Sequence, residues 1–485
     1  MNNCCTLPRQ DGFNLAVVGA GSAGFSAAIT AAELGASVAL IGHGTIGGTC
    51  VNVGCVPSKA LIRAAEAVRG GRAAARFPGL GGSVQLEDWS ALAASKDALV
   101  GELRQKKYAD LLPAYEGVSY IEGKVHFDGT TLMVDDAPMK AGKIILAMGA
   151  RAAVPPIPGL DTVPFLTSTT ALALERLPKS SLVIGGGVIG VELGQMFARL
   201  GVEVTICCRS RLLPELDEEL SAALQTYLEA EGVRVCAGIG YQRIAQTAGG
   251  VELTCESLSC DGKGHCDTAA TVQTITAEQV LVATGRKPNS DGLGLEARGI
   301  TLGRKGGIVV NDYLETTVPG IYAAGDVTGR DQFVYMAANG AKLAARNAVT
   351  GNQHRYDNAA MPAVVFSDPQ VASVGLTEAA ARAQGLEVKT SLLPLDAVPR
   401  ALAARDTRGM IKLVADKGTD RLLGGQIMAP EGADSIQTLV LAIKYGMTTA
   451  ELGATTFPYL TTVEGLKLAA QTFDKDVAKL SCCAG

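Results

Sequence analysis

Two glycine-rich turns, each lying between an apolar strand and a helix, constrain the fold of this chain most strongly. The first follows Leu15-Ala16-Val17-Val18, and the second follows Leu182-Val183-Ile184. In such turns the glycines permit a tight bend, and the helix N-terminus faces a pyrophosphate. Two copies in this frame predict two dinucleotide-binding domains. The candidate phosphate-binding residues are Gly19, Gly21, Ser22 and Gly24 in the first turn and Gly185, Gly187 and Gly190 in the second.

Length and composition fit this picture. A chain of 485 residues is too long for one domain, and 47% hydrophobic residues suffice for several cores. The net charge of −5 gives no reason to expect a nucleic acid partner. No apolar run is long enough to span a bilayer and no signal peptide is recognisable, so we expect a cytoplasmic protein without stable membrane association.

Two further strands end in glycine and each is expected to close a nucleotide-binding half. They are Ile144–Gly149 and Val280–Gly285, so Gly149 and Gly285 are candidate cofactor contacts. A third strand ends in Gly325-Asp326, where the carboxylate of Asp326 is placed to accept a hydrogen bond from a ribityl hydroxyl.

The second strand of each nucleotide-binding half distinguishes the ligands, because an acid at its end usually binds the adenosine ribose. In the second half this position is Cys208, followed by Arg209 and Arg211. Two guanidinium groups suit a 2′-phosphate and favour NADPH, although a solvated basic loop is the alternative. In the first half the position is Gly42. The missing acid predicts weaker retention of the first cofactor.

A cysteine pair lies about thirty residues after the first turn. Cys50 and Cys55 follow Gly47-Gly48-Thr49 and precede the apolar run Ala60, Leu61, Ala64, Ala65 and Val68. A single helix with both thiols in its first turns explains the spacing, and a thiolate is stabilised at a helix N-terminus. The pair is therefore expected to cycle between disulfide and dithiol and to exchange electrons with a bound dinucleotide.

In this order, the motifs resemble the flavoprotein pyridine nucleotide–disulfide oxidoreductases across almost the whole chain. The resemblance implies an α/β fold with two Rossmann-like nucleotide-binding domains and a C-terminal α+β dimerisation domain. It implies FAD bound by residues 1–150 and 288–355, NADPH bound by 151–287, and a homodimer formed through 356–485. The flavin contacts that it implies include Gly48, Thr49 and Lys59, and it pairs Lys59 with Glu192 beside the flavin.

The C-terminal segment departs from the members of this family that reduce disulfides. Those members use a histidine, oriented by a glutamate five residues later, to protonate the leaving thiolate. Here the glutamate is Glu464 and the residue five positions earlier is Tyr459, and no histidine follows His354. The chain ends in Cys482-Cys483-Ala484-Gly485. Adjacent cysteines form a disulfide only with strain, whereas two thiolates suit a soft metal ion.

These departures resemble the members of the family that reduce mercuric ions. The resemblance implies that Cys482 and Cys483 of one subunit take Hg(II) from small thiols and pass it to Cys50 and Cys55 of the other. Electrons then pass from NADPH through FAD to the metal, which leaves as Hg(0). It also places Tyr108 and Tyr459 beside the metal, although a half-buried helical position is the simpler interpretation of Tyr108.

Other cysteines have no assigned role. Cys255, Cys260, His265 and Cys266 predict a polar hairpin that is either an auxiliary soft-metal or zinc site or a surface loop with free thiols. Cys4-Cys5 is interpreted as incidental. Two alternatives to Hg(II) reduction stay open. One is a thioredoxin-reductase-like enzyme with Cys482-Cys483 as a second redox pair, and the other is a metal-sequestering flavoprotein without catalysis.

Overall fold

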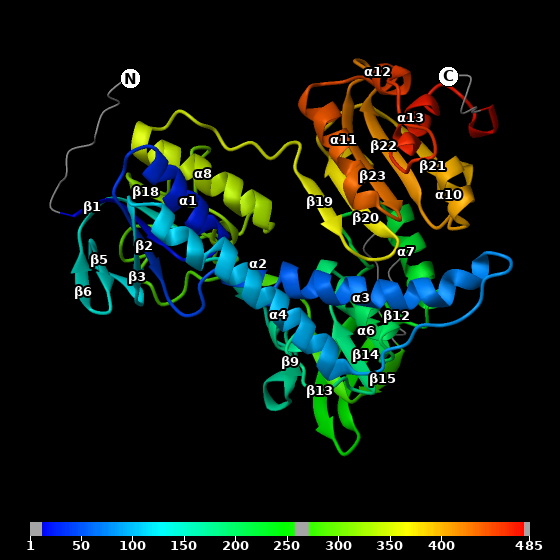
Figure 1. Cartoon of the computed structure of the whole chain (residues 1–485), viewed down its shortest axis with the longest axis horizontal. Helices are drawn as coiled ribbons and strands as arrows, with labels where there is room; N and C mark the ends of the chain where they lie inside the picture. Colours follow the sequence, from blue (N-terminus) through cyan, green and yellow to red (C-terminus); the bar gives the residue numbers. More distant parts are fainter. Residues whose placement is uncertain (1–11, 258–270, 480–485) are drawn as a thin grey trace. The chain divides into compact units, whose positions relative to one another are not determined.

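The computed structural model describes residues 12–257 and 271–479 (Figure 1). The chain forms two compact units. The first contains Met1–Ala60, Ser90–Ala153 and Arg286–Asn358, and the second contains Leu61–Trp89, Val154–Gly285 and Ala359–Gly485. Over the described residues, no helix is both long enough and apolar enough to cross a membrane. The predicted α/β class is confirmed, while the predicted limits of three separate domains stay predictions.

A five-stranded parallel sheet forms the centre of the first unit. Its strand order is β18-β7-β1-β2-β3. The central strand β1 (Phe13–Val18) pairs with β2 (Val38–Gly42) and β7 (Ala141–Leu146). Both faces of such a sheet are covered at its centre, and β2 and the second half of β1 are accordingly apolar and buried. The outer strands are β3 (Val118–Glu122) and β18 (Ile321–Ala323).

Helices α1 (Ser22–Glu33) and α8 (Val334–Thr350) lie side by side on this sheet (Figure 1). Their contact is built from alanines, including Ala27, Ala31, Ala341 and Ala344, all buried. Small side chains let the two helices approach closely. The remaining elements of this unit are α2 (Gly48–Val53), the start of α3 (Cys55–Ala73), α4 (Trp89–Lys107), β4 (Val125–Asp128), β5 (Thr131–Val134), β6 (Ala137–Met139), β8 (Ala150–Ala152) and β17 (Arg286–Pro288).

A second parallel sheet, of order β12-β11-β10-β16-β9, lies in the second unit. Its central strand β10 (Ser180–Ile184) leads into α6 (Val188–Arg199). An antiparallel sheet of β13 (Ile239–Thr247), β14 (Gly250–Ser257) and β15 (Val272–Ala277) shares its hydrophobic core. The other elements are α5 (Ser168–Ala171), α7 (Glu218–Ala230), β9 (Phe165–Leu166), β11 (Glu203–Cys207), β12 (Arg234–Cys236) and β16 (Gln279–Val282).

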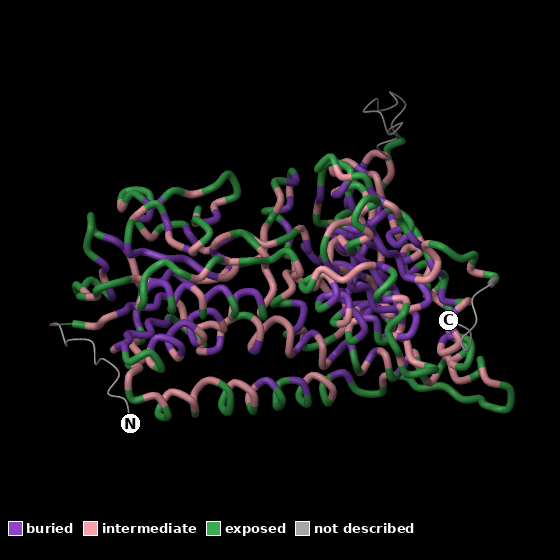
Figure 2. Tube along the Cα trace, turned by 90° about the horizontal axis from the view of Figure 1, so that it is seen from above, coloured by how far each residue is buried: buried purple, intermediate pink, exposed green. Residues whose placement is uncertain are grey.

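The C-terminal part of the second unit is an antiparallel sheet of order β19-β20-β23-β22-β21. Helices α11 (Gly432–Lys444) and α13 (Glu464–Gln471) pack on this sheet, and its three central strands are mostly buried. Figure 2 marks buried residues along the chain in purple. The strands are β19 (Pro362–Val365), β20 (Gln370–Gly375), β21 (Val388–Pro394), β22 (Met410–Asp416) and β23 (Leu422–Ala429), and the smaller helices are α9 (Glu378–Ala383), α10 (Pro399–Ala404) and α12 (Thr449–Ala454).

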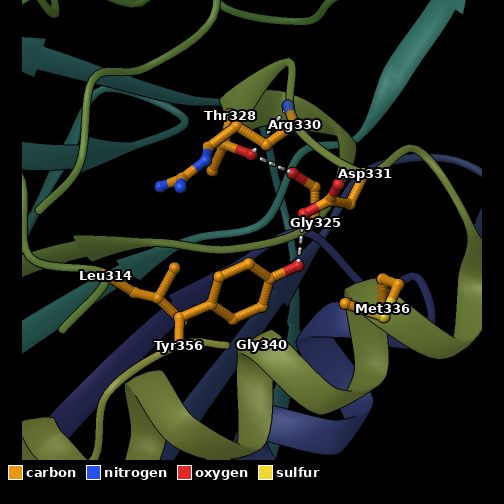
Figure 3. Close-up of a pocket in the computed structure, with 8 residues that line it drawn as sticks. All are labelled: Leu314, Gly325, Thr328, Arg330, Asp331, Met336, Gly340 and Tyr356. Atoms are coloured by element: carbon orange, nitrogen blue, oxygen red, sulfur yellow. Dashed lines mark hydrogen bonds between the residues drawn. The ribbon is translucent and has the colours of Figure 1, made fainter. Parts of the chain in front are cut away.

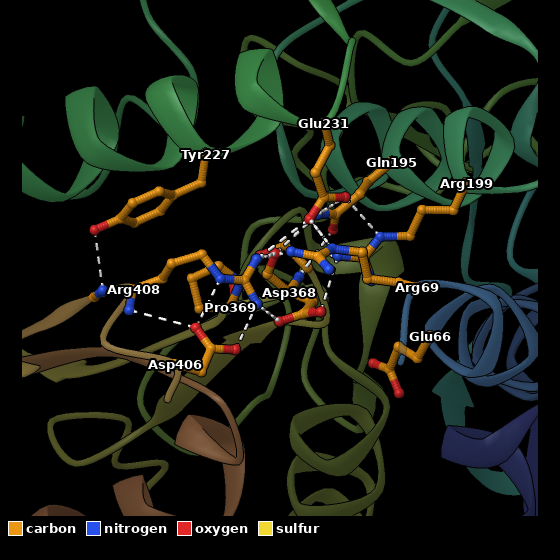
Figure 4. A network of polar contacts seen from close by, with 12 residues as sticks. Glu66, Arg69, Gln195, Arg199, Tyr227, Glu231, Asp368, Pro369, Asp406 and Arg408 are labelled. Carbon is orange, nitrogen blue, oxygen red and sulfur yellow. Dashed lines mark hydrogen bonds and ion pairs between the residues drawn. The ribbon is translucent and has the colours of Figure 1, made fainter. Parts of the chain in front are cut away.

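A network of charged side chains joins elements of the second unit that are distant in sequence (Figure 4). Glu231 receives two 2.7 Å hydrogen bonds from Arg199, whose side chain is 5% exposed. Arg69 and Arg408 also contact Glu231, each at 3.2 Å. Asp368 accepts from Arg199 at 2.8 Å and from Arg408 at 2.9 Å. Each buried charge therefore has an opposite charge beside it, which buried ions require.

Candidate functional site: two glycine turns and a cysteine pair

The first glycine turn leaves no room for side chains at two of its glycines. Gly19 has φ +114°, and a Cβ there would lie 2.3 Å from the Ala147 carbonyl oxygen. A Cβ on Gly24 would lie 1.7 Å from the Gly19 oxygen. Gly21 is the extended residue before α1, and Ser22 is the first residue of that helix. The turn therefore presents an unblocked helix N-terminus to a ligand, and it fits a pyrophosphate.

The segment that carries the cysteines packs directly on this turn. The Gly47 amide donates to the Ala20 carbonyl at 2.9 Å, and Gly47 pairs with Gly21 as an isolated parallel bridge. Gly48 has φ +68°, and a Cβ there would lie 2.7 Å from the Gly21 Cα. Only glycine at 48 permits this approach. The fold thus brings the start of the cysteine segment against the phosphate-binding turn.

Cys50 and Cys55 lie on two helices, so the expectation of a single helix is wrong. Cys50 belongs to α2, and Cys55 is the first residue of α3. Gly54, with φ −130° and ψ −113°, ends α2, and its carbonyl accepts the first hydrogen bond of α3 from Ser58 at 3.1 Å. Both cysteines are half-buried, and no disulfide joins them in this structure. The break places Cys55 at a helix N-terminus, where a thiolate is stabilised.

The two thiols interact electrostatically. A hydrogen bond with Cys55 raises the pKa of Cys50, and burial and the charge of Cys55 add to the rise. The charge of Lys59, one turn into α3, acts in the opposite direction. While both cysteines are reduced, Cys50 therefore keeps its proton to a higher pH than an ordinary cysteine does. Lys59 lies close enough to favour a thiolate.

Asn52 holds α2 in place, and sequence reasoning missed it. Its side-chain amide donates to the carbonyls of Ile46 and Gly48, at 2.8 and 2.9 Å. Arg104 of α4 donates to its oxygen at 3.3 Å. In the sequence, the one indication of these hydrogen bonds is an asparagine two residues after Cys50. Its partners can be identified only once the fold is known.

Tyr108 follows the end of α4, and its ring lies beside the cysteine segment. Its hydroxyl lies 3.1 Å from the Ser22 hydroxyl, and its ring meets Phe25 edge-on at 4.9 Å. Burial raises the pKa of Tyr108, and the charges of Cys50 and Cys55 add to the rise. The phenol is therefore kept protonated close to the thiol pair. Tyr108 therefore has defined polar and aromatic partners beside the thiol pair, which the simpler interpretation as a half-buried helical residue does not include.

Tyr335 of α8 is a second phenol near the pair that the sequence did not reveal. Burial and the charges of Asp331 and Cys55 raise its pKa. Its ring stacks on Phe333 with 5.4 Å between centroids. Figure 3 shows a small pocket next to this helix, beside Gly325, where the Tyr356 hydroxyl donates to Asp331 at 2.8 Å.

Asp326 follows β18, as the sequence indicates, but it lies beyond the strand and begins a short 3-10 helix (Asp326–Thr328). Burial raises its pKa, and Arg286, 3.5 Å away, acts against that rise. Gly149 has φ +69°, and a Cβ on it would meet nothing within 4 Å. The neighbouring strands β18 and β7 are therefore followed by a half-buried acid and an open glycine, as a cofactor site at the carboxyl edge of a parallel sheet requires.

The second turn repeats the geometry of the first. Gly185 has φ +120°, and a Cβ there would lie 2.3 Å from the Ala283 oxygen, while a Cβ on Gly190 would lie 2.0 Å from the Gly185 oxygen. Gly187 and Gly285 are open, with nothing within 4 Å of an added Cβ. This turn also fits a pyrophosphate at the N-terminus of α6.

The two arginines proposed for a 2′-phosphate differ in their surroundings. Arg209 is exposed after β11. Arg211 donates to the carbonyls of Pro214 and Leu216, at 3.1 and 2.6 Å. Arg211 therefore also holds the loop that follows, a role that the sequence did not indicate.

Four cysteines lie in the core of this half of the second unit. Cys207, Cys208, Cys236 and Cys255 are all buried thiols. Cys255 belongs to β14, which pairs antiparallel with β15, and it donates to the Gln273 carbonyl at 3.8 Å. The expected hairpin is present at Cys255, but the expectation of a polar position there is wrong because the side chain is buried. Alternation along the strand turns its side chain into the core. Its predicted companions Cys260, His265 and Cys266 lie outside the described residues, as do Cys4 and Cys5.

The positions that replace the histidine–glutamate pair lie in the C-terminal part. Glu464 is 4% exposed, and its carboxylate accepts from the Leu460 amide at 3.1 Å. Tyr459 is 55% exposed. Glu192 is buried in α6 and accepts from the Phe366 amide at 2.8 Å. Glu464 thus stabilises the turn that presents Tyr459. Cys482 and Cys483 lie outside the described residues.

These two nucleotide turns and the thiol pair define a class of redox protein. The pyridine nucleotide-disulphide oxidoreductase family matches residues 13–345, and the dimerisation domain of that family matches residues 361–470. The chain belongs to this family, and it is an oxidoreductase. Membership implies a flavin and a pyridine nucleotide.

Within this family, the chain is similar to proteins named mercuric reductase. The chain is 44% identical to the mercuric reductase of Staphylococcus aureus over 100% of this chain and 86% of that protein. It is 44% identical to the mercuric reductase of Streptomyces lividans over 99% and 100% of the two chains. Among solved structures, a Cu(II) complex of the HOCl-induced flavoprotein disulfide reductase RclA from Escherichia coli is 29% identical, with a TM-score of 0.80 over 96% of this chain and 100% of that one.

Proposed function

We propose that this protein is an NADPH-dependent, FAD-containing reductase of Hg(II), with Cys50 and Cys55 as a redox-active pair that also binds the metal. The observation that carries the proposal is the packing of Gly47 and Gly48 on the first glycine turn, which holds the thiol pair against a nucleotide site. The names of the relatives favour Hg(II) as the substrate. One NADPH supplies the two electrons that convert one Hg(II) to Hg(0), with NADP⁺ and one proton as the other products.

The residues of the first unit fit FAD, and those of the second glycine turn fit NADPH. FAD, when bound, supplies a two-electron carrier between the nicotinamide and the cysteine pair. We assign the flavin to residues 1–150 and 288–355, with Gly19, Gly21, Ser22, Gly24, Gly48, Thr49, Gly149 and Asp326 among its contacts. We assign NADPH to residues 151–287, with Gly185, Gly187, Gly190, Arg209, Arg211 and Gly285 among its contacts.

The thiol pair first binds Hg(II) and then releases the reduced metal. Each thiol loses its proton when it binds Hg(II), and the two thiolates hold the soft cation between them. Lys59 favours the ionised form of Cys50. Reduction delivers two electrons to the metal, both metal–sulfur bonds break, and the two thiolates remain. The leaving atom needs no proton, in keeping with a C-terminal part that contains no histidine after His354.

Tyr108 is the described phenol best placed to assist. It lies near the thiol pair and is hydrogen-bonded to Ser22 of the glycine turn. A neutral hydroxyl there stabilises the thiolates without competing for the metal as an anion would. We propose the same assisting role for Tyr459 and an ion pair between Lys59 and Glu192 beside the flavin.

Delivery of the metal is assigned to the C-terminal cysteines. We propose that Cys482 and Cys483 of one subunit of a homodimer take Hg(II) from small thiols and pass it to the pair of the partner subunit. A cytoplasmic location belongs to the same proposal, because thiols stay reduced there. The variant Cys482→Ala/Cys483→Ala should keep reduction of the flavin by NADPH and lose turnover of thiol-bound Hg(II). Full turnover would remove the tail from the mechanism.

A comparison of oxidants tests the function. Purified protein with NADPH and excess small thiol is offered Hg(II), Cu(II), a low-molecular-weight disulfide or thioredoxin in parallel. The proposal predicts fast NADPH oxidation with Hg(II) and release of volatile mercury. Fast turnover of a disulfide or thioredoxin with none for Hg(II) would instead support the thioredoxin-reductase-like alternative. NADPH oxidation with Cu(II) and not with the other oxidants would indicate that Cu(II), rather than Hg(II), is the substrate.

A further inference from the structure

The missing acid at the end of β2 has a structural explanation. Gly42 is the last residue of β2, where the acid that binds an adenosine ribose usually lies. A Cβ on Gly42 would lie 2.7 Å from the Tyr120 hydroxyl and 2.8 Å from the Ala20 Cβ. Tyr120 of β3 therefore fills the space that an acidic side chain at 42 would need. A substitution to glutamate alone would force this ring to move.

An acid stands at the matching end of the neighbouring strand. Glu122 is the last residue of β3, and it is paired in register with Gly42. The next amide, Gly123, donates to the Gly42 carbonyl at 2.8 Å, which fixes the two strand ends together. Neighbouring strands lie about 4.8 Å apart, within the reach of a glutamate side chain. The carboxylate of Glu122 is exposed at the carboxyl edge of the sheet, where the nucleotide is expected.

We propose that Glu122 takes over the role of the missing acid and accepts hydrogen bonds from the hydroxyls of the adenosine ribose of FAD. The inference rests on the proposed FAD site of the first unit. The Tyr120 hydroxyl lies beside Gly42, and Gly42 is the register partner of Glu122, so the phenol and the acid belong to the same strand ends. Burial raises the pKa of Tyr120, and the charge of Glu122 adds to the rise. Tyr120 positions the ribose side of the site, and Glu122 binds the sugar. The weaker cofactor retention expected from Gly42 alone then does not occur.

The test compares two flavins on wild type and three variants by the quenching of flavin fluorescence on binding to the apoprotein. Wild type should bind FAD about tenfold more tightly than an FAD analogue that lacks an adenosine ribose hydroxyl, the size of one hydrogen bond to a charged group. Glu122→Gln should lose most of this discrimination. The control Glu116→Gln alters an exposed carboxylate that precedes β3 and should discriminate like wild type.

Each outcome has a distinct meaning. Unchanged discrimination in Glu122→Gln would overturn the inference, and so would its loss in His43→Ala, which alters the exposed residue after Gly42. Absence of FAD binding by the folded wild-type protein would contradict the proposed function itself. Tight FAD binding that is insensitive to the ribose hydroxyls would contradict only the assignment of Glu122.

Discussion

Replacing Glu231 by glutamine is expected to destabilise the second unit strongly. The carboxylate of Glu231 is 10% exposed and contacts three arginines. Of these, Arg199 is 5% exposed, whereas Arg408 and Arg69 are 20% and 29% exposed and can turn to water. The cost therefore comes mainly from Arg199, which among the described residues keeps only Asp368 as an ionic partner, at 2.8 Å.

Removing one partner from a buried ion pair costs about 3–5 kcal/mol. The remaining Asp368 contact places Glu231→Gln at the lower end, at about 3 kcal/mol. The protein has one tryptophan, Trp89, which is 8% exposed and donates to the Leu174 carbonyl at 2.8 Å within the second unit. Its fluorescence in urea reports unfolding of that unit. With an m value of about 3 kcal/mol/M, the midpoint should fall by about 1 M.

Glu66→Gln is the matched control. Glu66 pairs with Arg63 at 2.7 Å in the same unit, but the Arg63 side chain is 66% exposed. Such pairs contribute about 0–1 kcal/mol, so the midpoint should move by less than about 0.3 M. Equal shifts for the two variants, or no shift for Glu231→Gln, would refute the idea that burial makes the network strong.

Three other outcomes follow from the same structure. Burial disfavours ionisation of Glu231, but the arginines around it, Arg199 foremost, outweigh burial and lower its pKa. The stabilisation from the ionised carboxylate is therefore present above the ordinary glutamate pKa of about 4.3 and is lost as pH falls through the lower pKa of the folded protein. Urea midpoints below about pH 4.3 should fall more steeply in wild type than in Glu231→Gln. Tyr108→Phe removes the contact with Ser22 and should lower Hg(II) turnover up to about tenfold, a barrier change near 1.4 kcal/mol, while flavin content stays at the wild-type level; unchanged turnover would exclude the phenol from the reaction. Gly24→Ala should abolish flavin retention, because its Cβ would lie 1.7 Å from the Gly19 oxygen. The control Gly70→Ala, whose Cβ would meet nothing within 4 Å, should keep the flavin and stabilise α3 by about 0.5–1 kcal/mol. Equal flavin retention in the two variants would contradict this account of the turn.

The parts of the fold that the sequence predicts are those with a strong local cause. Apolar runs such as Leu15–Val18 and the glycines that follow them predict the strand, turn and helix because each residue type is required by the backbone at that point. The spacing of Cys50 and Cys55 predicts a pair of thiols near a nucleotide. It does not predict the break at Gly54, because no sequence pattern indicates the backbone angles that one glycine adopts.

The parts that the sequence does not predict depend on contacts between distant residues. Tyr120 blocks the position of Gly42 from a neighbouring strand, and Arg104 holds Asn52 from a helix fifty-two residues away. The network around Glu231 joins side chains from residue 69 to residue 408. Such partners become visible only when the chain is folded, because no periodicity connects them.

The most direct test of the central claim is the stoichiometry of the reaction under anaerobic conditions. Limiting NADPH is added to the purified protein with excess thiol-bound Hg(II), and the volatile mercury is collected and counted. The account predicts one Hg(0) for each NADPH consumed, and none from Cys50→Ala or Cys55→Ala although their flavin is still reduced. Volatile mercury formed at the wild-type rate by either variant, or NADPH consumed without Hg(0), would contradict it.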